Sequence, residues 1–256
     1  MKEKQEVIDA IEAIPEFEMI DIFIDRDGEK ILNEKFKAVT EKGSSDILSV
    51  VTNKYQLAQF KESFLPTVEK IEGLDGRVIY HRGNALAEIY PKGENFVVEG
   101  GQRIGLMIRN SVTTESALLV NFTIASKNWH VIVPRNVKGF RKVHIGNQKI
   151  AENFMRMVDE VKPAWKQIAT EFTTYRPTED ELKELVCGRM KFSEKRLDGI
   201  KEKMYSDGNR PNLWEIYLEM VRKISEEGNF SSGINEEKQI EKICSAMIGY
   251  AMSFAL

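Results

Sequence analysis

The stretch GRVIYHRGNALAEIYPKG, residues 76–93, decides the fold class of this chain. Two runs rich in β-branched, aromatic and aliphatic residues flank Arg82-Gly83-Asn84, which is the pattern of a β-hairpin. GQRIGLMIRNS (101–111) and ESALLVNFTIAS (115–126) follow and are joined by a short polar turn. WHVIVPRN (129–136) continues the pattern, and Pro134 favours a place at a sheet edge. We therefore predict an antiparallel meander of three or four strands.

The region before the meander predicts further elements. Residues 2–13 and 55–73 carry apolar side chains at helical spacing. Between them, IDIFIDRDGEKIL (20–32) alternates around Asp27-Gly28, which predicts a second hairpin, and 46–52 reads as a strand.

From Gly146 onward the apolar spacing is helical. One apolar stripe runs over 150–172, and a capping box from Thr178 to Glu181 opens a helix that reaches about Met190. Further helices are predicted over 193–205, 211–227 and 236–254. The prediction is thus an α+β fold, with a core domain over 1–175 and an all-helical C-terminal region over 176–256.

Composition limits the class of protein. The 256 residues have a formal net charge of −3, with 42% hydrophobic and 30% charged residues, which is typical of a soluble globular protein. Cys187 and Cys244 are far apart and do not form a disulfide framework, so we expect a reducing cytoplasm. The N-terminus lacks the apolar region of a signal peptide, and the chain has no uncharged apolar stretch of membrane-spanning length. We expect no membrane partner.

The search for catalytic motifs favours a non-enzymatic protein. The chain has no nucleophile elbow, phosphate-binding loop, zinc-protease motif or paired Cys-x-x-Cys. His81, His130 and His144 lack metal-ligand spacing, so we expect neither a metal nor a cofactor. An enzyme with an unrecognised site stays open, because an absent motif is not an absent activity.

The basic stretch KNWHVIVPRNVKGFRKVHIGNQK, residues 127–149, is the strongest functional signal. Residues 101–150 hold eight Lys or Arg and one acid, whereas residues 1–50 hold seven basic and thirteen acidic residues. Basic side chains neutralise phosphates, and aromatic rings stack on unpaired bases. The predicted nucleic-acid-binding residues are Arg103, Arg109, Lys127, Trp129, His130, Arg135, Lys138, Phe140, Arg141, Lys142 and Lys149. The alternative is a solvated loop whose charges pair with the acidic N-terminal region.

Several short segments resemble a family of uncharacterised phage- and plasmid-encoded proteins. These segments are VTNKYQLAQF (51–60), IRNS (108–111), SALL (116–119), KVHIGN (142–147) and NLWEIY (212–217). The chain departs from the family at Val112-Thr-Thr-Glu115 and at Arg222-Lys-Ile224. The resemblance implies a mobile element and a cytoplasmic location in a bacterial or archaeal host, but no activity. The predicted topology is also similar to that of phage single-strand annealing recombinases.

These observations predict a non-enzymatic protein that binds or anneals single-stranded nucleic acid, with DNA favoured, in recombination or replication. The competing class is a structural or protein-interaction protein, for example a self-assembling, virion-associated or host-inhibitory one. The acidic N-terminal and basic central sections also predict a head-to-tail homo-oligomer, closed as a ring or continued as a filament.

Overall fold

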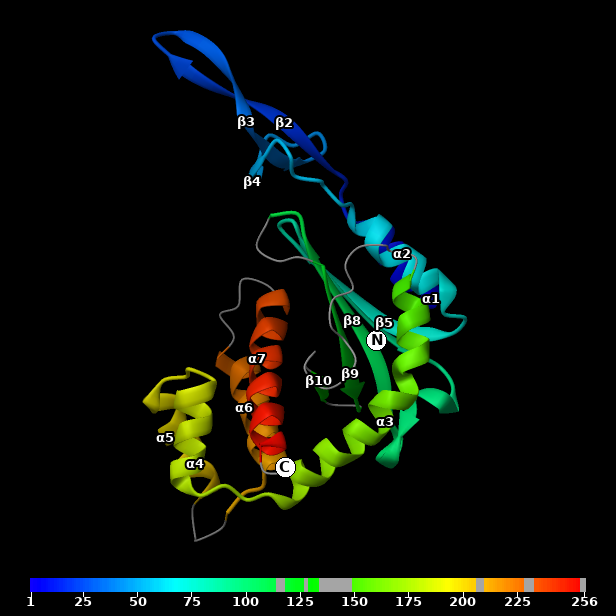
Figure 1. Ribbon diagram of the computed structural model, residues 1–256, viewed down its shortest axis with the longest axis vertical. Coiled ribbons are helices and arrows are strands. Elements are labelled where there is room, and N and C mark those ends of the chain that lie inside the picture. Colours follow the sequence, from blue (N-terminus) through cyan, green and yellow to red (C-terminus); the bar gives the residue numbers. More distant parts are fainter. Residues whose placement is uncertain (114–117, 127–128, 134–148, 206–209, 228–232, 254–256) are drawn as a thin grey trace. The chain divides into compact units, whose positions relative to one another are not determined.

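Two antiparallel sheets and a set of helices make up the fold, which a computed structural model describes for all residues except 114–117, 127–128, 134–148, 206–209, 228–232 and 254–256 (Figure 1). The predicted α+β class with a helical C-terminal region is confirmed. The chain divides into unit 1 (Met1–Glu94, Gly105–Val120 and Lys142–Met155) and unit 2 (Asn95–Ile104, Asn121–Arg141 and Arg156–Leu256). The predicted boundary between residues 175 and 176 stays a prediction.

The larger sheet contains the predicted meander and extends it. Its strand order is β1-β5-β6-β8-β9-β10, with β7 paired to β8. The strands are β1 (Lys2–Glu3), β5 (Leu74–His81), β6 (Asn84–Pro91), β7 (Val97–Val98), β8 (Gln102–Ser111), β9 (Leu119–Ala125) and β10 (His130–Val133). The turn between β5 and β6 holds Arg82 and Gly83 at φ 43° and 72°, as a two-residue hairpin turn requires. β10 ends the strand order, which confirms the predicted edge strand.

A smaller sheet in unit 1 has the order β2-β3-β4, with β2 (Phe17–Arg26), β3 (Glu29–Glu41) and β4 (Ile47–Thr52). Asp27 and Gly28 form the turn at φ 57° and 85°, so the predicted second hairpin is confirmed. Its base is anchored, because the Phe17 ring meets the Phe60 ring edge-on at 5.3 Å and the Tyr80 hydroxyl donates a hydrogen bond to the Glu41 carboxylate.

Two helices in unit 1, α1 (Lys4–Glu12) and α2 (Phe60–Lys70), contact each other. Each buries one apolar stripe, which includes Val7 and Ile11 in α1 and Phe64 and Val68 in α2. α2 is shorter than the helix predicted over residues 55–73, because it begins at Phe60 and ends at Lys70.

The remaining helices are α3 (Ile150–Thr174), α4 (Glu179–Lys183), α5 (Glu194–Met204), α6 (Leu213–Glu227) and α7 (Gly233–Met252). Pro163 lies inside α3 and does not end it. Thr178 caps α4 as predicted, but the chain then continues as a π-helical segment, Glu184–Arg189. In unit 2, α7 packs on β10 and on α6. None of the described helices is long and apolar enough to cross a membrane.

Candidate functional site

The predicted binding residues divide into described and undescribed positions. Six of them, Lys127, Arg135, Lys138, Phe140, Arg141 and Lys142, lie outside the described residues. Arg103, Trp129 and His130 belong to unit 2, whereas Arg109 and Lys149 belong to unit 1. Lys149 is exposed, and Arg103 is half-buried. Arg109 is buried on β8 opposite Leu86, with 6% of its surface exposed.

Trp129 takes part in an aromatic cluster of unit 2. Its ring makes a T-shaped contact with Trp214, with a centroid separation of 4.4 Å and an interplanar angle of 78°. Trp214 stacks in turn on Tyr217 at 5.5 Å and lies 6.1 Å from Phe172. Trp129 comes directly before β10 and packs against Trp214 of α6. The ring predicted to stack on bases is therefore in contact with another aromatic ring of unit 2.

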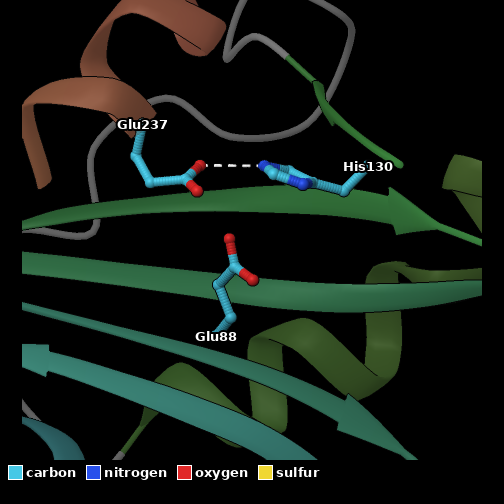
Figure 2. A group of neighbouring side chains, drawn as sticks. All are labelled: Glu88, His130 and Glu237. Carbon is cyan, nitrogen blue, oxygen red and sulfur yellow. Dashed lines mark hydrogen bonds and ion pairs between the residues drawn. The ribbon is translucent and has the colours of Figure 1, made fainter. Parts of the chain in front are cut away.

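His130 lies in a buried polar cluster built from β10, α6 and α7. Its Nε2 is 2.8 Å from a carboxylate oxygen of Glu237, and the two side chains are 17% and 4% exposed (Figure 2). The Tyr217 hydroxyl donates a hydrogen bond to the backbone carbonyl of His130. Burying a carboxylate costs free energy unless polar groups hydrogen-bond to it, and His130 supplies such a group to Glu237. The position of His130 is therefore explained by the fold.

Two neighbouring contacts extend this cluster within unit 2. The Asn121 amide donates to a Glu241 carboxylate oxygen at 3.0 Å, and the Ile132 backbone N–H donates to the Cys244 sulfur at 3.3 Å. Burial raises the pKa of the Cys244 thiol to about 12. A thiol with that pKa is not ionised near neutral pH, so Cys244 is not a nucleophile of the reactive kind.

His130 and Glu237 are residue types that bind metals, but among the described residues of unit 2 they form only a pair. Within either unit, the described side chains offer no group of three His, Cys, Asp or Glu ligands close together. Figure 2 draws His130 and Glu237 together with Glu88, which belongs to unit 1. Both carboxylate oxygens of Glu88 accept hydrogen bonds from Arg77, at 2.8 and 3.1 Å. Because protein zinc sites use three or four protein ligands, the pair in unit 2 is better explained as an internal hydrogen bond.

A cavity of about 590 Å³ opens beside α3 within unit 2. Its lining residues are Val97, Val98, Gly100, Gln102, Lys162, Pro163, Trp165, Lys166, Ala169, Thr170 and Thr173. The Trp165 indole N–H donates to the Gln102 side-chain oxygen at 2.8 Å, which joins the two walls. Lys162 and Lys166 are among the lining residues, and the Lys162 ammonium lies 3.6 Å from the Asp159 carboxylate.

The sequence analysis did not predict this cavity, because it considered only the apolar stripe of residues 150–172, which forms the buried face of the helix. A signal was present on another face. Lys162, Lys166 and Thr170 follow at intervals of four residues, which places them on one side of an α-helix. The pattern indicates a polar helix face, although it does not say what lies opposite.

The described residues thus form a cavity beside α3 whose lining includes two lysines, and a part-buried hydrogen bond between His130 and Glu237; they show no recognisable catalytic arrangement. Comparison of the chain with protein-family models, curated proteins and solved structures gives no match.

Proposed function

We propose that this chain is a non-enzymatic protein that binds or anneals single-stranded nucleic acid, with DNA as the preferred ligand, in the recombination or replication of a phage or plasmid. The observation that carries the proposal is the composition of residues 127–149, which contain six Lys or Arg and no acid. A segment of that composition binds phosphates by releasing their counterions. The phage or plasmid setting rests on the resemblance of the short segments.

The acidic N-terminal region is a weak competitor for these basic charges. Glu16 lies 3.1 Å from Lys42, Asp21 lies 3.4 Å from Lys37, and Glu3 lies 3.5 Å from Lys92. The Lys42 ammonium also lowers the pKa of the Glu16 carboxyl. Several acids of this region thus have cations of their own in unit 1, which favours an external anion as the partner of the basic segment.

The proposed contacts are assigned according to burial. Phosphates are met by the exposed Lys149 and by the basic side chains outside the described residues: Lys127, Arg135, Lys138, Arg141 and Lys142. Phe140 stacks on a base, while Trp129, His130 and Arg109 serve the fold. Arg103, which is half-buried on β8, is the proposed second contact for the anionic strand.

Fluorescence anisotropy with a labelled single-stranded oligonucleotide tests the proposal. Each phosphate contact on a single strand contributes about 0.7 to the slope of log affinity against log salt, so Arg141→Ala with Lys142→Ala should reduce the slope by about 1.4. The matched control is Lys183→Ala with Lys195→Ala, which removes two exposed lysines from α4 and α5. Absence of binding at low salt, or equal slopes for all three proteins, contradicts the proposal.

A protein-interaction role is the second candidate, and one observation favours it. The small sheet of unit 1 exposes large apolar side chains, among them Phe23, Ile24 and Ile47, which are 53–59% exposed. Exposed apolar surface of this extent is common at protein interfaces. The ratio of absorbance at 260 and 280 nm after purification separates the two roles, since nucleic acid retained by the protein favours the first and a clean oligomer that ignores oligonucleotides favours the second.

A further inference from the structure

The β2–β3 hairpin carries apolar side chains on both of its faces. Phe23 is paired with Leu32, and the next residue, Ile24, is paired with Ile31. Successive residues of a strand point to opposite faces, so each face of the hairpin tip holds one apolar pair. These four side chains are 45–56% exposed, which means that the described parts of the chain leave both faces uncovered.

β2 is also an edge strand, whose charged residues are Glu18, Asp21, Asp25 and Arg26. The order β2-β3-β4 leaves one side of β2 without a partner strand among the described residues. The strand is ten residues long and contains neither Pro nor Lys, the residues that commonly block pairing at an edge. The β2–β3 ladder is irregular between the pairs Asp21–Lys37 and Phe23–Leu32. Between these pairs β2 has one residue, Ile22, and β3 has four, residues 33–36, so the extra residues lie on β3. β2 itself runs without an insertion.

We propose that β2 pairs antiparallel with β2 of a second copy of this chain, centred on Ile22. In this register Glu18 lies opposite Arg26 of the other copy, and this opposite-charge pair occurs twice because the contact is two-fold symmetric. Ile20 lies opposite Ile24, so three isoleucines from each copy follow one another on one face. These are Ile20, Ile22 and Ile24, and the first and last are 38% and 53% exposed.

Other registers bring unfavourable pairs together. A shift of one residue in either direction would set side chains of opposite faces against each other, which a two-fold symmetric antiparallel pair does not permit. A shift of two residues places Asp21 opposite either itself or Asp25. Because like charges directly opposite each other destabilise a ladder, the charges of β2 select the register centred on Ile22.

Reversing the charges of Glu18 and Arg26 in the 256-residue chain tests the register. Sedimentation velocity measures whether each variant is a monomer or a dimer. Glu18→Arg and Arg26→Glu should each weaken dimerisation by about tenfold, since two attractive pairs become repulsive. The double variant Glu18→Arg with Arg26→Glu restores opposite charges and should restore the dimer. A charge-independent dimer, or a double variant that stays monomeric, overturns the proposed pairing.

Ile22→Lys provides a second test, because it places an ammonium opposite its own copy at the centre of the contact. Its matched control is Ile47→Lys on β4, the other edge strand of the same sheet, with circular dichroism to confirm that both variants fold. Only Ile22→Lys should dissociate the dimer. A wild-type monomer at high micromolar concentration, a ring or filament, or dissociation by Ile47→Lys each overturns the inference. Oligonucleotide binding is measured separately, so the dimer and the proposed function stand or fall independently.

Discussion

Replacement of Trp129 by Ala distinguishes a packing role from a base-stacking role. The ring meets Trp214 in T-shaped geometry with centroids 4.4 Å apart, and both side chains are half-buried. Such a pair contributes about 1 kcal/mol beyond the area that it buries. Each single Trp→Ala variant should lose about 2 kcal/mol of unfolding free energy, less than a fully buried Trp. The double variant should then lose about 3 kcal/mol, because the shared contact is lost only once.

Urea unfolding followed by far-ultraviolet circular dichroism measures these energies without a tryptophan signal. The control cycle combines Trp129→Ala with Phe60→Leu, since Phe60 belongs to the aromatic cluster that Phe17 and Tyr80 form in unit 1. That cycle should be additive within about 0.5 kcal/mol. If the Trp129–Trp214 cycle is equally additive, the two rings do not interact in solution and the packing argument fails.

The same Trp129→Ala variant is then tested for oligonucleotide binding at a temperature where it is fully folded. Loss of a base-stacking ring costs about 1–3 kcal/mol, or roughly five- to 150-fold in affinity. A ring that serves the fold should leave the affinity within about twofold of the wild type. A loss of tenfold or more would return Trp129 to the nucleic-acid interface and would refute its packing role.

Three further predictions concern unit 2. A thiol reagent near pH 8 should modify Cys187 alone in the folded protein and both cysteines in urea, because burial raises the pKa of Cys244 to about 12; two fast reactions without urea would contradict this. Hydrogen bonds from Tyr175 and Thr178 lower the pKa of the Glu181 carboxyl in the folded protein. The ionised carboxylate therefore stabilises the fold above its unfolded pKa of about 4.3, and this stabilisation is lost as the pH falls through the lowered pKa of the folded state. Tyr175→Phe should therefore flatten the acid side of a plot of melting temperature against pH, and an unchanged slope would count against it. Thr178→Ala should cost about 1 kcal/mol in urea unfolding, since Thr178 accepts a hydrogen bond from the Glu181 backbone N–H at 3.3 Å.

Hairpins were the most predictable parts of the fold, because their signals are local. Asp27-Gly28 and Arg82-Gly83 supply the left-handed backbone conformations of tight turns, and the strands follow on both sides. The Thr178–Glu181 capping box is equally local and marks the start of α4. Wherever two to four adjacent residues determine the geometry, the sequence and the structure agree.

Long-range contacts explain where the prediction fails. The apolar pattern of 55–73 predicts a helix that includes Leu57, but α2 begins at Phe60. The Gln59 side chain accepts a hydrogen bond from the Phe17 backbone N–H at 3.0 Å and donates one to the Phe17 carbonyl at 2.8 Å. These bonds hold Gln59 in extended conformation as the N-cap, so a partner 42 residues away determines the start of the helix.

The candidate site shows the same limit in terms of charge. A count of basic residues treats Arg109 and His130 like the lysines of the basic stretch 127–149, yet Arg109 is 6% exposed and His130 is hydrogen-bonded to a carboxylate 107 residues away. Local sequence cannot distinguish a cation that a distant acid satisfies from one that faces solvent. The distinction follows secondary structure, since both of these side chains lie on strands of the larger sheet. The proposed interface therefore rests on the basic composition of residues 127–149, together with the half-buried Arg103 on β8.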